Sequence, residues 1–183
     1  MDKHSDNHNG DLPIENQEKI REIEEFEKKK KEYIATILKR DIPTFNSEGG
    51  VKRIPLSEVI DPKTDLWFSP GKPKPIINEE GLNNIARTAG VIFKDELIEK
   101  QSDFSNVQGG QVWYESTAVF PNGETNTESG VANGLNCKDN ISKAHMPLMA
   151  KKRARSRALL RSPLINLSIF DESEVTDHII EKV

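Results

Sequence analysis

A three-residue turn between two β-rich runs limits the fold of this chain more than any other sequence feature. Residues 109–120 (GGQVWYESTAVF) are rich in β-branched and aromatic side chains, and residues 124–135 (ETNTESGVANGL) follow directly after the tripeptide PNG. A short connection that contains glycine is typical of a β-hairpin. Residues 96–104 (ELIEKQSDF) have a strand pattern as well, and the three runs together predict an antiparallel meander.

Helices are expected on both sides of this predicted sheet. Residues 78–90 (NEEGLNNIARTAG) carry apolar side chains at helical spacing and end at Gly90. A long helix is expected over residues 142–161, with Pro163 behind it and Pro147 marking either its start or a kink. The fold class is therefore α+β: a three-stranded antiparallel meander with a long helix packed across it (a β-β-β-α core), and an extra N-terminal helix.

Four regions are expected along the 183 residues. They are a disordered tail (1–14), a charged N-terminal helix (15–45), a core (46–165) and an acidic C-terminal tail (166–183). The helical stretch 15–40 has a narrow apolar stripe, which would pack either on a neighbouring molecule or on its own domain. Many prolines and glycines predict an irregular connector over residues 41–75, with a helical turn near 56–60 and a short extended piece at 66–68.

The composition argues against several classes of protein. The single cysteine, Cys137, cannot form an intrachain disulfide or a cysteine-rich zinc site. The histidines lack metal-binding spacing, no phosphate-binding glycine loop is present, and the carboxylates are not paired as a magnesium site requires. We therefore expect no catalytic residue, no metal and no cofactor. Since no apolar run is long enough to span a bilayer and the first residues lack the pattern of a signal peptide, we expect a cytoplasmic protein with no membrane partner.

Positive charge is concentrated in one segment of a chain whose net charge is −4. Residues 140–170 contain seven lysines and arginines and no aspartate or glutamate. Such segregation is typical of a binding site for a polyanion. A solvated helix face would produce the same pattern, so the charge alone leaves both interpretations open.

Within the predicted last helix, small residues and cations fall into rows one turn apart. The rows consist of Ala150, Ala154 and Ala158 in the middle, Arg153, Arg157 and Arg161 on one side, and Lys151 and Arg155 on the other, with Lys152 further round. The small residues would let the helix approach a sheet or another helix closely. Cations about 6 Å apart suit the phosphates of an extended single strand, with strong dependence on salt and no base readout.

Two other features are consistent with nucleic-acid binding but do not establish it. Trp67 and Phe68 stand close in sequence to Lys72 and Lys74 and would either stack a base beside positive charge or cover the core. Gly130 and Gly134, at the end of the third predicted strand, permit close approach of a neighbouring subunit or of DNA, or mark a bulge.

The order and spacing of these segments resemble the single-strand annealing domain of the Rad-fifty-two superfamily and its phage relatives. In that family a helix precedes a β-β-β-α core, the third strand ends in a stretch of the type GxGxxxG, and the last helix carries a motif of the type KRAxxRAL. Here the glycine stretch is SGVANGL, without the first of its usual glycines, and the helix motif is KKRARSRALL at residues 151–160. The resemblance covers about residues 76–162, roughly half of the chain.

The resemblance implies ATP-independent binding of single-stranded DNA and annealing of complementary strands in homologous recombination or repair, as in a phage recombinase. It also implies a homo-oligomer, a ring or filament built by joining sheets edge to edge, that works with a single-strand-binding protein or a recombinase. The positions that match the family's inner DNA groove are Lys151, Lys152, Arg153 and Arg157, and those that match a basic loop before the first core helix are Lys72 and Lys74.

The sequence therefore predicts a non-enzymatic protein that binds single-stranded DNA through nine basic residues. These are Lys72, Lys74, Lys143, Lys151, Lys152, Arg153, Arg155, Arg157 and Arg161. The alternative is a non-catalytic oligomeric scaffold or recombination mediator, which recruits other proteins through the N-terminal helix and the acidic tail. A nuclease or other nucleic-acid enzyme is a third, weaker possibility, because a site can assemble from scattered residues.

Overall fold

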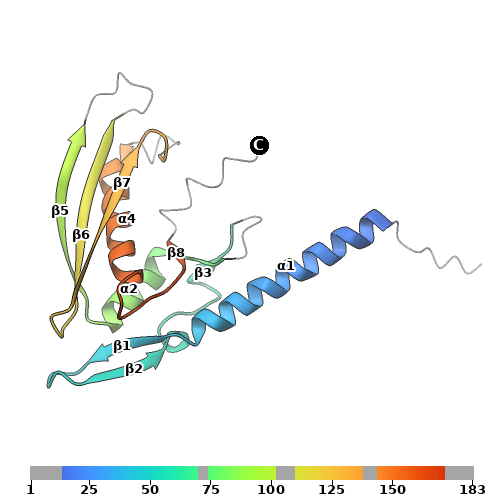
Figure 1. Ribbon diagram of the computed structural model, residues 1–183, viewed down its shortest axis with the longest axis horizontal. Coiled ribbons are helices and arrows are strands. Elements are labelled where there is room, and N and C mark those ends of the chain that lie inside the picture. Colours follow the sequence, from blue (N-terminus) through green and yellow to red (C-terminus); the bar gives the residue numbers. More distant parts are fainter. Residues whose placement is uncertain (1–13, 70–73, 102–109, 138–143, 172–183) are drawn as a thin grey trace, which may run out of the picture.

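The computed structural model describes residues 14–69, 74–101, 110–137 and 144–171, and it confirms the α+β fold class (Figure 1). The elements are α1 (Ile14–Leu38), β1 (Asp41–Phe45), β2 (Val51–Pro55), the 3-10 turn η1 (Leu56–Glu58), β3 (Leu66–Trp67), β4 (Ile76–Ile77), α2 (Glu79–Thr88), β5 (Ile92–Gln101), β6 (Gln111–Val119), β7 (Thr125–Asn133), α4 (Met146–Leu160) and β8 (Phe170–Asp171). Helix α1 confirms the predicted N-terminal helix, and the sheet β5-β6-β7 packs against α4.

The central sheet is the predicted antiparallel meander. Strands β6 and β7 pair along their full lengths, and the turn between them contains Gly123 with a φ of 88°. This left-handed conformation carries no steric penalty for glycine. Strand β5 pairs with the other side of β6 and starts at Ile92, earlier than the predicted 96–104, with a shift of register between Leu97 and Glu99.

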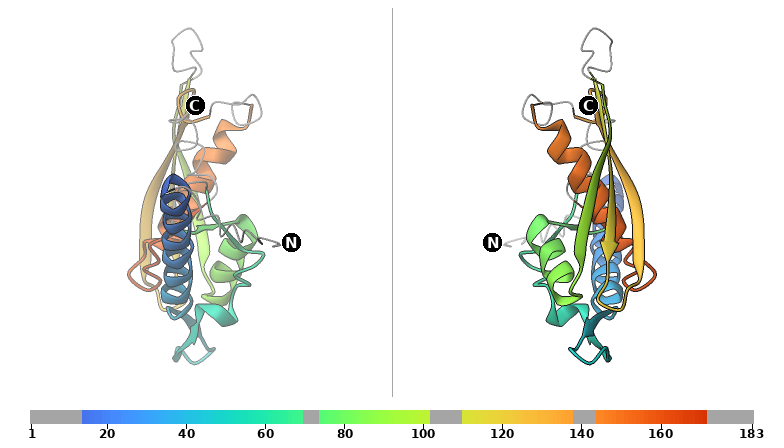
Figure 2. Two further views of the ribbon diagram at one scale, coloured as in Figure 1. Left: turned by 90° about the vertical axis from the view of Figure 1, so that its right-hand side faces the viewer. Right: turned by 90° about the vertical axis from the view of Figure 1, so that its left-hand side faces the viewer.

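Helix α4 lies on one face of this sheet, which Figure 2 shows edge-on. The predicted row of small residues, Ala150, Ala154 and Ala158, is fully buried. Opposite this row, a Cβ atom added to Gly130 of β7 would lie 2.1 Å from the carbonyl oxygen of Ala150 and 2.4 Å from the amide nitrogen of Ala154. The close neighbour that Gly130 admits is therefore the chain's own helix, not DNA or a second subunit.

Prolines explain both a correct and an incorrect sequence prediction. Pro147 occupies the first turn of α4 and so marks the start of the helix, where its missing N–H costs nothing. The prediction of an irregular connector over residues 41–75 is wrong in its first part, because β1 and β2 form an antiparallel hairpin that includes Pro43. A proline is tolerated there because each strand of a two-stranded sheet has an open edge. The turn expected at 56–60 and the extended piece at 66–68 are present as η1 and β3.

The main hydrophobic core lies where α2, the end of α4 and the β6–β7 turn meet. Ile85 of α2, Leu159 of α4 and Phe120 are buried together there. Helix α2 begins after Asn78, whose Oδ1 accepts a hydrogen bond of 2.8 Å from a backbone amide in the first turn. It ends before Gly90, which has a φ of 64° and follows the helix as the sequence predicts.

The segment after α4 belongs to the body of the protein. Ile165, Leu167 and Ile169 are buried, and β8 pairs in parallel with β4 to complete the small sheet β3-β4-β8. The first part of the predicted acidic tail, 166–183, is thus packed on the core. The rest of that tail and the predicted N-terminal tail up to residue 13 lie outside the described residues.

Candidate nucleic-acid interface

The two predicted rows of cations lie on opposite sides of α4. One row points to the outer edge of β7, and the other points to β5 and α2. The first consists of Arg153, Arg157 and Arg161, and the second of Lys151, Arg155 and Lys152. Lys72 and Lys143, also predicted to bind DNA, lie outside the described residues.

Arg153 is buried inside the fold. Its side chain is 1% exposed, and its guanidinium donates one hydrogen bond of 2.7 Å to the carbonyl oxygen of Val131 and one of 3.1 Å to that of Asn136. A buried guanidinium remains charged and requires acceptors for its N–H groups. Arg153 therefore links α4 to β7 and to the turn that follows. This placement corrects the expected role of Arg153 as a residue that faces an open DNA groove.

Arg157 repeats this type of contact one helical turn later. Its Nη1 donates a hydrogen bond of 3.0 Å to the carbonyl oxygen of Ser129. Among the described residues β7 is an edge strand with no strand beyond it, and Arg153 and Arg157 donate hydrogen bonds to two of its carbonyl groups. A strand from another molecule that paired with β7 would have to displace both guanidinium groups.

Asp95 of β5 holds the cations on the other side of α4. Arg155 donates to its carboxylate through Nη2 and through Nε at 2.9 Å, Lys151 Nζ lies 3.0 Å away, and Ser116 Oγ donates at 2.9 Å. Burial alone would raise the pKa of Asp95. The hydrogen bonds from Arg155, Lys151 and Ser116, together with the positive charge of Arg155, outweigh burial and lower the pKa from 3.8 to about 2.

We predict that the fold becomes less stable in acid because Asp95 is protonated there and loses its ionic hydrogen bonds. A carboxyl group whose pKa is lower in the folded than in the unfolded chain stabilises the fold above its unfolded pKa, and this stabilisation is lost as the pH falls from about 5 toward 2. The expected loss is about 1–2 kcal/mol, reduced because Arg155 and Lys151 are partly exposed to solvent. Urea unfolding from pH 7 to pH 2 measures it.

The control for this prediction is Asp95→Asn, which keeps the shape of the side chain and removes its charge. The variant should be less stable than the wild type at pH 7, and the difference should shrink as the pH approaches 2. A difference that stays constant over the whole range would contradict the proposed ionic role of Asp95.

Lys152 reaches helix α2. Its Nζ lies 2.6 Å from Oε2 of Glu79, a residue in the first turn of α2, where the helix dipole favours negative charge. Both side chains are partly exposed, so the pair contributes about 0–1 kcal/mol. On this side of α4, the carboxylates of Asp95 and Glu79 balance much of the positive charge.

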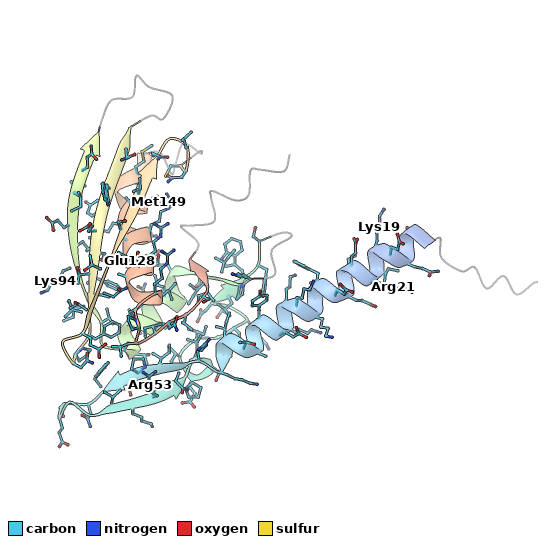
Figure 3. The ribbon with its side chains drawn as sticks, in the orientation of Figure 1. Lys19, Arg21, Arg53, Lys94, Glu128 and Met149 are labelled. Atoms are coloured by element: carbon cyan, nitrogen blue, oxygen red, sulfur yellow. The ribbon has the colours of Figure 1, made fainter. Side chains whose placement is uncertain are left out.

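A surface pocket of about 270 Å³ lies at the C-terminal end of α4, and we call it the basic pocket. It brings together three of the predicted DNA-binding residues, Lys74, Arg157 and Arg161, from two segments that are far apart in sequence. Arg161 is 54% exposed, and its Nη1 lies 3.7 Å from Oε2 of Glu128, which Figure 3 labels on β7 beside α4. The basic pocket therefore brings three of the predicted cations together at the surface.

Sequence reasoning missed the polar residues that complete the basic pocket. Ser156 lies on α4 between the rows of cations, while Asn166 and Ser168 come from the segment assigned to the acidic tail. Asn166 has a φ of 48°, a left-handed conformation that asparagine adopts more readily than most residues. The alternation of apolar and polar residues over 165–169 (INLSI) is the sequence signal that could have shown that this segment packs on the core.

The aromatic residues before Lys74 differ in their surroundings. Trp67 on β3 is exposed, as a stacking role requires. Phe68 is partly buried, and the ammonium group of Lys30 on α1 lies 5.2 Å from the centre of its ring. Phe68 therefore takes part in the contact between α1 and the body, and Trp67 is the aromatic side chain that is open to a ligand.

Comparison of the chain with protein-family models, with curated proteins and with solved structures found no match. Within the described ranges there is no group of three or more His, Cys, Asp or Glu side chains placed to hold a metal ion. None of the helices in the part of the chain that the structure describes has the length and apolar character needed to cross a membrane.

Proposed function

We propose that this protein binds single-stranded DNA and anneals complementary strands without ATP, as a homo-oligomer that acts in recombination or repair. The observation that supports this most strongly is the basic pocket, in which Lys74, Arg157 and Arg161 meet at the end of α4. Two guanidinium groups and one ammonium group favour phosphate as the ligand, since arginine forks match phosphate oxygens. The chain from residue 140 to 170 contributes no carboxylate to repel it.

The size and the neutral lining of the basic pocket fit the same ligand class. A volume of about 270 Å³ is at the small end of ligand pockets, and it suits a phosphate with its sugar better than a whole nucleotide cofactor. Ser168 and Asn166 are exposed and add a hydroxyl and an amide donor of the kind that contact DNA backbones, whereas Ser156 is buried and its hydroxyl donates to the carbonyl oxygen of Arg153. Contacts of this type read no sequence, and they leave the bases available for pairing.

The side of α4 that faces β5 and α2 is a less suitable path for the strand. Arg155 and Lys151 are bonded to Asp95, and Lys152 is paired with Glu79. A phosphate that approached this side would meet two carboxylates that lie 3.0 and 2.6 Å from their lysine partners, whereas on the β7 side the carboxylate of Glu128 lies further, 3.7 Å, from Arg161. We therefore place the DNA backbone along the β7 side of α4, with the basic pocket as its main contact.

We predict that Arg161→Ala weakens binding to single-stranded DNA about three- to tenfold at moderate salt. The loss of one phosphate contact should also reduce the salt dependence of binding, by about 0.7 in the slope of log K against log salt. Fluorescence anisotropy with a labelled oligothymidylate at several salt concentrations measures both quantities. Lys74→Ala is expected to act in the same direction, and the double variant should be weaker than either.

Lys94→Ala is the matched control for these variants. Lys94 is an exposed cation on the sheet face opposite α4, as its register shows, and Figure 3 shows it pointing away from the helix. Its removal changes the net charge by the same amount but should leave the affinity and the salt slope almost unchanged. If Lys94→Ala weakens binding as much as Arg161→Ala, the basic pocket is not the binding site.

The annealing step has its own test. Two complementary oligonucleotides that carry a fluorescence donor and acceptor are mixed with the protein in the absence of ATP, and the rate of duplex formation is measured. We expect acceleration by the wild type and less acceleration by Arg161→Ala. The scaffold alternative predicts no binding and no acceleration, and shortened oligonucleotide products in the presence of magnesium would instead indicate a nuclease.

A further inference from the structure

Helix α1 extends away from the body of the protein along most of its length (Figures 1 and 2). All residues from 16 to 25 are exposed, and Ile37 in the last turns is buried where the helix meets the body. Most of the stability of a helix in a protein comes from packing of one face. Within the part of the chain that the structure describes, α1 packs on the body only at one end, which points to a partner for the other end.

The exposed part of α1 carries an apolar stripe. Ile20 and Ile23 are 44% and 62% exposed, and they lie at helical spacing on the same face as Ile34, which is partly buried, and Ile37, which is buried. The stripe thus continues beyond the body into solvent. Adjacent exposed isoleucines on one helix face are typical of a surface that packs against another helix.

The charges of α1 change sign in the middle of the helix. Residues 14–27 contain six glutamates and two basic residues, Lys19 and Arg21, which Figure 3 labels on the projecting part. Residues 28–31 are four consecutive lysines. The helix dipole favours acidic residues only in the first turn and basic residues only in the last. It does not explain a change of sign between Glu27 and Lys28.

We propose that α1 pairs in antiparallel orientation with α1 of a second copy of this chain. Antiparallel overlap centred on the change of sign places Lys28–Lys31 of each copy opposite Glu24–Glu27 of the other. It also covers Ile20 and Ile23 with the helical turn at residues 32–35 of the second copy. Parallel pairing would set glutamates against glutamates and lysines against lysines, which is unfavourable.

Lys30 is kept out of the experiment because it has a role within one chain. Its Nζ lies 2.7 Å from Oε1 of Glu27, and it stacks over the rings of Phe26 and Phe68 at 4.7 and 5.2 Å. The remaining charges of α1 that flank the change of sign are exposed: Glu22, Glu24, Glu25, Lys28, Lys29 and Lys31. They can be exchanged without disturbing the contact between α1 and the body.

The test uses two full-length variants and sedimentation equilibrium over a range of concentrations. Variant one carries Glu22→Lys, Glu24→Lys and Glu25→Lys, and variant two carries Lys28→Glu, Lys29→Glu and Lys31→Glu. Each alone should self-associate at least tenfold more weakly than the wild type, because charges of mainly one sign then lie on both sides of the former change of sign and repel those of the second copy. An equimolar mixture should associate again, since a mainly basic segment around the former change of sign then meets a mainly acidic one.

The control variant changes the net charge at another surface by the same amount as variant two. Lys52→Glu, Arg53→Glu and Lys63→Glu alter exposed residues of β2 and the following loop, and they should leave association as in the wild type. Circular dichroism of each variant checks the helix content. The proposal is overturned if the two α1 variants associate like the wild type, or if mixing them does not restore association.

Cysteine cross-linking separates the two orientations. The native Cys137 is buried, whereas a cysteine introduced at the exposed position of Lys19 can form an intermolecular disulfide. Lys19→Cys should not cross-link to itself, but it should cross-link to Thr36→Cys when the two variants are mixed. Efficient cross-linking of Lys19→Cys alone would show parallel pairing and would contradict the proposal, whatever the outcome of the DNA-binding experiments.

Discussion

Gly130→Ala is expected to lower the free energy of unfolding by about 3 kcal/mol or more, one of the two largest effects we predict for this chain. The added Cβ would lie 2.1 Å from the carbonyl oxygen of Ala150 and 2.4 Å from the amide nitrogen of Ala154. Both neighbours are backbone atoms of α4, so no side chain can rotate out of the way. The helix must move off the sheet, and the buried alanine row loses its contact with β7.

Urea or thermal unfolding measures this effect, and Gly49→Ala is the control. Gly49 has a φ of 80°, and a Cβ added to it would have no atom within 4 Å, so its substitution carries only the conformational cost of about 1 kcal/mol. Gly130→Ala should therefore be clearly more destabilising than Gly49→Ala. Equal effects would mean that α4 does not lie as close to β7 as the structure places it.

The sheet and its helix could be predicted because their signals are local. The PNG turn and the alternation of residues around it define β6 and β7, and the row Ala150, Ala154 and Ala158 predicts a helix that approaches a neighbour closely. The β1–β2 hairpin could not be predicted in the same way. Proline normally disfavours a β-strand. Pro43 is tolerated in β1 because the described β1–β2 sheet has no third strand, so that β1 has an open edge.

The candidate site was only partly predictable for a related reason. Helical periodicity correctly assigns the cations of α4 to two sides, because that depends on residues within one helix. Their partners, Asp95 on β5, Glu79 on α2 and the carbonyl groups of β7, come from other elements. Tertiary contacts therefore decide which cations are bonded inside the fold. The sequence alone does not distinguish Arg153 from Arg161, although Arg153 is buried and Arg161 is exposed.

Arg153→Met is expected to be the second strongly destabilising change, with a loss of about 3 kcal/mol. Methionine fills most of the same space but donates no hydrogen bond, so the carbonyl groups of Val131 and Asn136 lose the guanidinium donors at 2.7 and 3.1 Å, and Val131 retains the hydrogen bond of 3.1 Å from Asn136 Nδ2. For a chain of this size the loss corresponds to a fall of about 6–12 °C in Tm. Differential scanning calorimetry measures it, with the exposed Arg161→Met as the matched control.

The same pair of variants separates a structural arginine from a DNA-binding one. Arg153→Lys should recover only part of the stability, since one ammonium group replaces a planar fork that spans two carbonyl oxygens. Well below its Tm, Arg153→Met should bind single-stranded DNA nearly as the wild type does, whereas Arg161→Met should keep its Tm and bind less tightly. The reverse result, a normal Tm with lost binding in Arg153→Met, would place Arg153 at the DNA surface. Within one basic motif, burial then decides the role: the arginine whose donors face the β7 backbone stabilises the fold, and the exposed arginine at the basic pocket, whose Nη1 lies 3.7 Å from Glu128, is the one we expect to contact phosphate.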